Sequence, residues 1–193
     1  AKEGNAINTA DHPNAAFLCV PPRADREWAP AGDEMTYARL STRIENLRRL
    51  YQDAGYGHGH RVALLLENRP EFFEHYLALN ALGVGIVPIN PDYRHDEMLY
   101  QMTDSQAQLA IALPHHVAAL KAVGRDRALQ GNRPMPVVDA SAMPAKLPAA
   151  ICAPPLPLAP GLNTEAGLLY TSGTTGRPKG CILTNQYYLT AGG

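Results

Sequence analysis

The sequence has few of the residues that mark specialised classes of protein. Its three cysteines, Cys19, Cys152 and Cys181, are odd in number and widely spaced, and they match neither a disulfide framework nor a metal-ligand pattern. The 17 Lys and Arg are balanced by 18 Asp and Glu, so the formal net charge of −1 leaves no basic surplus for general nucleic-acid binding. The cysteine usage is typical of a reducing compartment, and we expect a cytoplasmic protein with no nucleic-acid partner.

Long hydrophobic runs are also missing. No apolar stretch approaches the length of a membrane span, and residues 1–20 lack a basic start followed by an apolar segment. We therefore expect no integral membrane segment. With 46% apolar and 18% charged residues, the composition is that of a globular protein, and 193 residues suffice for one sizeable core.

Apolar spacing predicts an alternation of helices and strands. A helix is expected over 36–55 with Thr36 as N-cap, and a continuous apolar run over 61–67 predicts a strand at the centre of a sheet. Asn68 as N-cap and Pro70 in the first turn predict a helix over 71–83. Further strands are expected at 84–90, 108–113, 135–140 and 166–172, and further helices at 95–105 and, as a short helix, at 115–123. This order indicates an α/β layered domain with a mainly parallel sheet and flanking helices.

Proline changes the character of the chain between 134 and 163. Eight of the seventeen prolines fall within 134–160, and that density cannot sustain a helix or a central strand. We expect an extended surface connection that leads into the strand at 166–172.

A loop rich in glycine and hydroxyl groups follows that strand, in the segment 168–180, LLYTSGTTGRPKG. Glycines allow positive φ and close approach of backbone N–H groups to an anion, and Lys179 adds a mobile positive charge. The Walker A pattern fails, because Pro178 stands five residues after Gly173 and Gly180 follows the lysine. We interpret the segment as a different phosphate-binding loop that continues as a strand through 181–184. A solvent-exposed hairpin without a ligand is the alternative.

These residues carry a family resemblance. The segment YTSGTTGRPKG, followed by CILTN, resembles the signature loop of the adenylate-forming enzymes, which include acyl-CoA synthetases, luciferases and peptide-synthetase adenylation domains. Upstream, TYARL and RVALLLENRPEFFEHYLALNALGVGIVPINP are similar to the N-terminal region of that family in the same order. The resemblance implies that 1–193 is a partial N-terminal AMP-binding domain, with the mobile C-terminal domain absent.

The resemblance also implies a two-step reaction. A carboxylate attacks the α-phosphate of Mg-ATP and releases pyrophosphate, and the thiol of coenzyme A then converts the acyl-adenylate into a thioester. ATP, Mg²⁺ and coenzyme A are the expected cofactors and co-substrates, with a small carboxylic acid as substrate. By similarity, the residues that hold the β- and γ-phosphates are Thr171, Ser172, Gly173, Thr174, Thr175, Gly176 and Lys179. By this resemblance these residues orient the phosphates and neutralise their charge, so no catalytic nucleophile and no metal ligand is assigned in this chain.

Departures from the family pattern restrict the function expected of the chain. The motifs for magnesium, adenine and the acyl pocket lie later in the family, so we expect these 193 residues to be inactive as a ligase by themselves and to leave an open sheet edge. Asn185 and Cys181 replace the commoner His and Val or Ala. The upstream segment is most similar to fatty-acid and carnitine-type ligases, which suggests fatty acid metabolism. A non-catalytic truncated relative, which binds phosphate or a partner, is the alternative. Neither the acid nor the oligomeric state can be deduced from the sequence.

Two histidine pairs attract attention as metal ligands. His58 and His60 stand in a turn before a strand, with no third ligand nearby in the sequence. His115 and His116 open a helix. We interpret both pairs as solvated surface residues.

Overall fold

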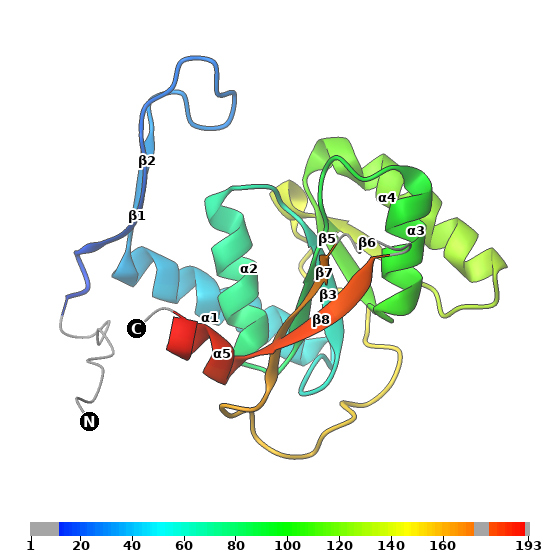
Figure 1. Cartoon of the computed structure of the whole chain (residues 1–193). Helices are drawn as coiled ribbons and strands as arrows, with labels where there is room; N and C mark the ends of the chain where they lie inside the picture. The colour runs from blue at the N-terminus through cyan, green and yellow to red at the C-terminus, as the bar shows by residue number, and fades with distance from the viewer. Residues whose placement is uncertain (1–11, 172–177, 192–193) are drawn as a thin grey trace.

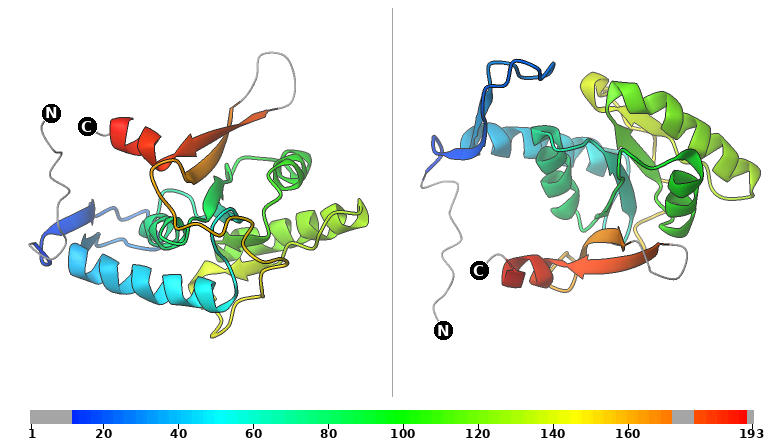
Figure 2. Two further views of the ribbon diagram at one scale, coloured as in Figure 1. Left: turned by 90° about the horizontal axis from the view of Figure 1, so that it is seen from below. Right: turned by 45° about the horizontal axis from the view of Figure 1, so that its top comes forward.

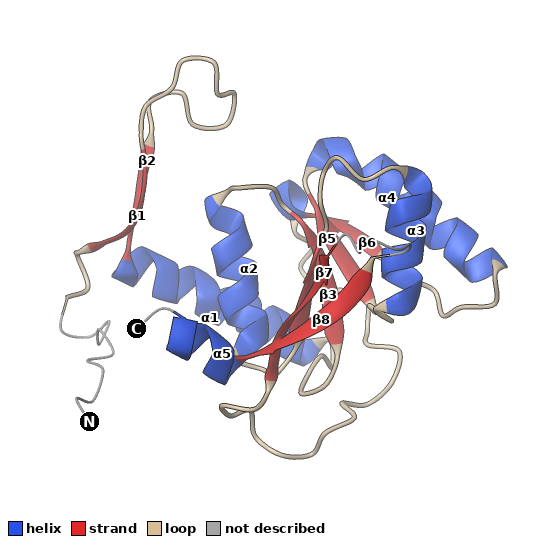
Figure 3. Cartoon of the chain, viewed as in Figure 1, coloured by secondary structure: helices blue, strands red, loops and turns tan. Residues whose placement is uncertain are grey.

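A computed structural model describes residues 12–171 and 178–191. Within these residues a six-stranded sheet has the order β6-β5-β3-β4-β7-β8, parallel throughout except for the antiparallel pair β7/β8 (Figures 1 and 3). Its strands are β3 (Arg61–Leu65), β4 (Gly85–Pro88), β5 (Leu109–Ala112), β6 (Val137–Asp139), β7 (Glu165–Thr171) and β8 (Lys179–Thr184). The helices are α1 (Tyr37–Asp53), α2 (Pro70–Asn80), α3 (His95–Asp104), α4 (Pro114–Leu129) and α5 (Asn185–Ala191), with a 3₁₀ turn at Ala140–Ala142. The prediction of an α/β fold with a mainly parallel sheet is confirmed.

The central strand β3 is buried on both of its faces. Val62 and Leu64 belong to a core that includes Tyr51 of α1, whereas Ala63 and Leu65 belong to a second core on the α3 and α4 side. Successive side chains of a strand point to opposite faces, so the continuous apolar run serves two helical layers at once. Figure 2 shows α1 and α2 on one side of the sheet and α3 and α4 on the other. The predicted central position of this strand is confirmed.

Helix starts follow the sequence with one correction. Thr36 caps α1 as predicted, with its Oγ1 accepting a hydrogen bond from the Arg39 N–H at 3.3 Å. The N-cap of α2 is Arg69, so the expectation for Asn68 is wrong. Because Pro70 occupies the first turn, the residue before it is held in an extended conformation and becomes the cap.

The helix expected over 115–123 is longer than the sequence pattern predicts. It continues past Gly124 to Leu129. A Cβ at Gly124 would lie 3.0 Å from the carbonyl oxygen of Met135. The glycine therefore permits close packing of α4 against the segment that enters β6, and its role is contact with a neighbour rather than termination.

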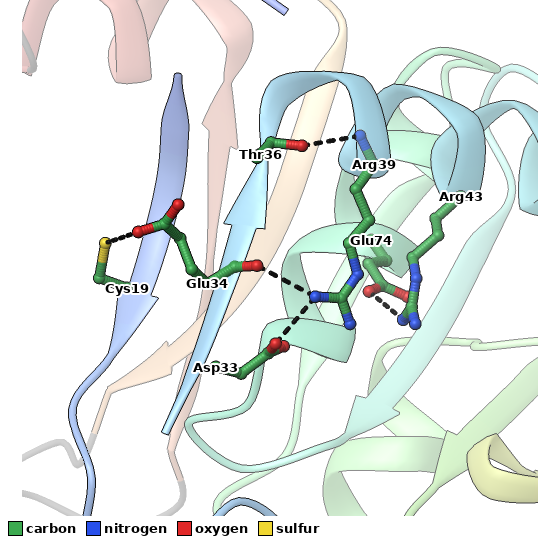
Figure 4. Close-up of polar contacts among 7 residues, drawn as sticks. All are labelled: Cys19, Asp33, Glu34, Thr36, Arg39, Arg43 and Glu74. Carbon is green, nitrogen blue, oxygen red and sulfur yellow. Dashed lines mark hydrogen bonds and ion pairs between the residues drawn. The ribbon is translucent and has the colours of Figure 1, made fainter. Parts of the chain in front are cut away.

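A hairpin of β1 (Ala16–Val20) and β2 (Asp33–Thr36) was not predicted, and it stands away from the main sheet (Figure 1). The first turn of α1 secures it, because Arg39 contacts both the Asp33 carboxylate at 2.8 Å and the Glu34 carbonyl at 3.0 Å (Figure 4). One turn later, Arg43 binds the buried Glu74 of α2 at 2.6 Å. Two arginines on one helix face thus connect the hairpin, α1 and α2.

The proline-rich connection is largely irregular, as predicted, but its middle is held by the turn before β3. The Tyr56 hydroxyl donates to the Pro148 carbonyl at 3.1 Å. His60 contacts the carbonyl oxygen of Ala153 at 3.2 Å, and His58 that of Leu158 at 2.7 Å. His60 is only 2% exposed. Our interpretation of this histidine pair as solvated is wrong, because the connection folds back over it.

Beyond β7, the described chain is sparsely covered. The edge strand β8 and helix α5 expose large apolar side chains, among them Ile182, Tyr187 and Leu189. The expected open edge is therefore present in the described residues. None of the described helices combines the length and the apolar character needed to cross a lipid bilayer.

The buried histidine His75 makes the stability of this fold depend on pH. Its Nδ1 lies 2.7 Å from the Tyr51 hydroxyl, and burial lowers its pKa from 6.5 to about 4. In the unfolded chain this histidine becomes protonated below pH 6.5, whereas in the native chain it stays neutral until about pH 4. As the pH falls from 6.5 to 4, the free energy of unfolding should therefore decrease by up to about 3 kcal/mol. Urea denaturation at pH 7, 5.5 and 4 measures this loss.

The variant His75→Gln isolates this contribution, because it keeps a polar side chain at the site and cannot titrate. Its free energy of unfolding should change less with pH than that of the wild type. Equal pH dependence in the two proteins would contradict the assignment.

Candidate phosphate-binding site

The structure places the two ends of the predicted phosphate loop side by side. Thr171 closes β7, Lys179 opens β8, and the two residues are directly paired in the antiparallel ladder. Paired residues of such a ladder share one face of the sheet, so the hydroxyl and the ammonium lie on the same side. Both residues are exposed. The other predicted phosphate-binding residues, Ser172, Gly173, Thr174, Thr175 and Gly176, lie outside the described residues.

Helix α3 holds both ends of the loop. The Tyr170 hydroxyl donates to the Asp104 carboxylate at 2.6 Å, and the Tyr100 hydroxyl donates to the Pro178 carbonyl at 3.0 Å. The two tyrosine rings meet edge to face with centroids 6.4 Å apart. Burial, aided by the hydrogen bond to Asp104, raises the pKa of Tyr170, so this hydroxyl remains a donor at neutral pH.

Alternation along β7 places these anchors on the opposite face from the predicted phosphate-binding residues. Tyr170 packs toward α3, and its neighbour Thr171 therefore points to the other face. A pocket of about 480 Å³ lies beside the anchors and is lined by Tyr100, Thr103 and Pro178, among others. Sequence reasoning missed Tyr100 and Asp104, because no local pattern links α3 to a strand more than sixty residues away.

An ion pair that crosses a whole strand positions the start of β7. Arg61 of β3 binds Glu165 of β7 through two bonds, from Nε at 2.6 Å and from a terminal nitrogen at 2.8 Å. Strand β4 lies between them, and its Gly85 is the register partner of Arg61. A Cβ at Gly85 would lie 2.6 Å from the Glu165 carboxylate. The glycine leaves the space through which the two side chains meet.

Asn185 at the start of α5 is occupied by structural contacts. Its side-chain amide donates to the Gly161 carbonyl at 2.9 Å, and its oxygen accepts from Asn80 at 2.8 Å. This residue therefore fastens α5 to the end of α2 and to the proline-rich connection.

The second histidine pair lies at the same edge of the sheet, in contact with a carboxylate. His115 and His116 both reach one oxygen of Glu67, at 2.8 and 2.9 Å. The His116 side chain is 18% exposed, so its interpretation as a solvated surface residue is wrong. Glu67 and His115 are 48 positions apart in the sequence, which explains why no local pattern connected them.

The family model described as AMP-binding enzyme matches residues 7–192, which is almost the whole chain. The chain belongs to this family. It corresponds to an N-terminal portion of the adenylate-forming enzymes, and the resemblance drawn from the loop is confirmed.

Curated members of the AMP-binding enzyme family include relatives with about one third of their residues identical. A feruloyl-CoA synthase from Amycolatopsis sp is 36% identical over 156 residues, which are 80% of this chain and 29% of that enzyme. A sulfoacetate–CoA ligase from Cupriavidus necator is 33% identical over 187 residues, which are 97% of this chain and 35% of that enzyme. A crotonobetaine/carnitine–CoA ligase from Citrobacter koseri is 30% identical over 177 residues, and the match covers 82% of this chain and 32% of that enzyme.

Solved structures of this family match the fold as well. The crystal structure of apo MatB from Rhodopseudomonas palustris has a TM-score of 0.64 at 28% identity, over 83% of this chain and 32% of MatB. The ATP-bound form of that protein has a TM-score of 0.63 at 26% identity, with the same coverage. The chain therefore spans about a third of the relatives it matches.

The variant Gly85→Ala tests whether the ion pair of Arg61 and Glu165 depends on the space above Gly85 of β4. The new methyl group should displace the Glu165 carboxylate and break its pair with Arg61, which should cost about 1–2 kcal/mol of unfolding free energy. Glu165→Gln should cost a similar amount. Because both changes remove the same interaction, the double variant should cost less than the sum of the two single variants.

Chemical denaturation of the four proteins measures this coupling. Gly161→Ala serves as the matched control, because a Cβ there meets nothing within 4 Å. Additive losses for Gly85→Ala and Glu165→Gln would contradict the proposed route of the ion pair.

Proposed function

We propose that the protein is an ATP-dependent ligase that joins a small carboxylic acid to coenzyme A through an acyl-adenylate. The observation that carries the proposal is the loop between β7 and β8. Its sequence resembles that of a phosphate-binding loop, and its described ends pair a hydroxyl with an ammonium on one face of the sheet. The curated relatives are CoA ligases, which supports this reaction type for the whole protein.

In this proposal the loop binds the β- and γ-phosphates of ATP. Lys179, together with Thr171 and the loop residues 172–176, neutralises the pyrophosphate as the substrate carboxylate displaces it from the α-phosphate. Positioning and charge stabilisation dominate catalysis of such transfers, and donors that are already oriented act without reorganisation at the moment of reaction. Tyr100 and Tyr170 contribute by holding the loop ends against α3.

In this proposal the described residues contribute phosphate contacts and the anchoring of the loop ends. One carboxylate, Asp104, contacts an end of the loop by accepting a hydrogen bond from Tyr170. We assign no magnesium ligand among the described residues and no step to Mg²⁺. The acid also stays unassigned. The carnitine or fatty-acid type and the cytoplasmic location are further parts of the proposal, and they rest on the sequence resemblance and on cysteine usage.

Exchange of labelled pyrophosphate into ATP, dependent on a carboxylic acid, tests the function. The natural polypeptide should catalyse exchange with at least one acid of a panel that includes ferulate, sulfoacetate and carnitine. Lys179→Ala should lower the exchange rate by about 100-fold, because the departing pyrophosphate loses a positive charge.

Lys146→Ala is the matched control, since this exposed lysine lies in the proline-rich connection, and its rate should be unchanged. The purified residues 1–193 should show no exchange, because they supply one wall of the nucleotide site. Absence of exchange by the natural polypeptide with every acid, or full activity in Lys179→Ala, would overturn the proposal.

A further inference from the structure

Three side chains that could ligate a metal converge at the carboxyl edge of the parallel sheet. His115 Nε2 and His116 Nε2 lie 2.8 and 2.9 Å from the same oxygen of Glu67. One potential ligand atom from each residue lies within 4.8 Å of the other two. Among the described residues, no other three His, Cys, Asp or Glu side chains bring their ligand atoms so close together. The centroids of the two imidazole rings are 4.1 Å apart and the ring planes are tilted by 50°. Both rings present their Nε2 atoms to the same carboxylate oxygen.

The backbone brings the three residues together from two elements. Glu67 follows β3 and has a positive φ of 55°, which is uncommon for a residue that is not glycine. The two histidines follow Pro114 in the first turn of α4, directly after β5. Strands β3 and β5 are parallel neighbours, so the segments after them leave the sheet side by side.

The donor set suits a borderline-soft cation. Two imidazole nitrogens and one carboxylate oxygen are typical ligands of Zn²⁺ and of Cu²⁺, Ni²⁺ or Co²⁺, whereas Mg²⁺ and Ca²⁺ prefer oxygen alone. Bonds of about 2.0–2.1 Å to a tetrahedral metal would separate the ligand atoms by about 3.3 Å. The hydrogen-bonded atoms, now 2.8 and 2.9 Å apart, need to part by only about 0.5 Å. An imidazole ring can carry its proton on Nδ1 while Nε2 ligates a metal.

The space beside the site suits an ion and a bound water. A pocket of about 400 Å³ borders Glu67 and His115 and leaves room for water in the remaining coordination position. The pocket is also an entry path for the ion.

We propose that Glu67, His115 and His116 bind one divalent transition-metal ion of the zinc class. The site lies on the same edge of the sheet as the phosphate loop, with β4 between β3 and β7. It goes beyond the proposed ligase function, because no step of acid activation uses it.

Titration of the purified chain with ZnCl₂, followed by calorimetry, tests this site. One ion should bind, and His116→Gln, His115→Gln and Glu67→Gln should each weaken binding by about tenfold or more. Zn²⁺ should raise the melting temperature of the wild type and not that of the three variants, because a ligand of the native state stabilises it. Melting without metal shows whether each variant is folded.

The matched control is His95→Gln, which removes a histidine paired with Asp126 at 2.8 Å but without a third ligand in the described residues. Its Zn²⁺ affinity should equal that of the wild type. Co²⁺ loading distinguishes this site from the free cysteines, because thiolate ligation produces an intense charge-transfer band in the near ultraviolet that histidine and carboxylate ligation lack. No saturable binding, binding that persists in folded His116→Gln and Glu67→Gln, or a thiolate band would overturn the proposal.

Discussion

Parallel pairing of strands that are buried on both faces is the constraint on which the rest of this structure depends. Because β3 pairs in parallel with both β4 and β5, and β7 continues the same direction, the segments that follow these strands all leave from one edge. Helices must cover both faces of such a sheet, and α1 and α2 on one side and α3 and α4 on the other do so. The residues of both proposed sites therefore lie at that edge, where the ladder leaves backbone groups unpaired.

On its β4 side, strand β7, which leads into the predicted phosphate loop, has little ladder pairing and is held by side chains. Its registered partnership with β4 is the single pair Ile86 and Gly167, and the ion pair of Arg61 with Glu165 reinforces it from two strands away. At its far end, Tyr170 binds α3. A strand tied to its neighbours at both ends presents its terminal residues in a defined position, which the proposed phosphate-binding role of the loop requires. The exposed edge β8 has no such support on its outer side in the described residues.

Local patterns predicted the elements well where burial is continuous, and poorly where it depends on distant residues. The apolar run of β3 and the Thr36 cap need no partner to be recognised. The hairpin β1/β2 was missed because its strands are short and half exposed, and a twelve-residue connection with no tight-turn signal joins them. The predicted fourth helix ended before Gly124, whereas α4 continues to Leu129. The glycine lies inside the helix because α4 packs closely there against the segment before β6, a contact that the local sequence does not reveal.

The sequence by itself determined the alternation of strand and helix and the family, because hydrophobic periodicity and a contiguous motif are properties of neighbouring residues. Tertiary structure alone decided that Tyr100 and Asp104 hold the loop ends, that Gly85 opens a passage for an ion pair, and that Glu67 meets two histidines. These contacts join residues separated by tens of positions. Their existence depends on strand order and register, which burial over the whole domain sets and no short segment encodes.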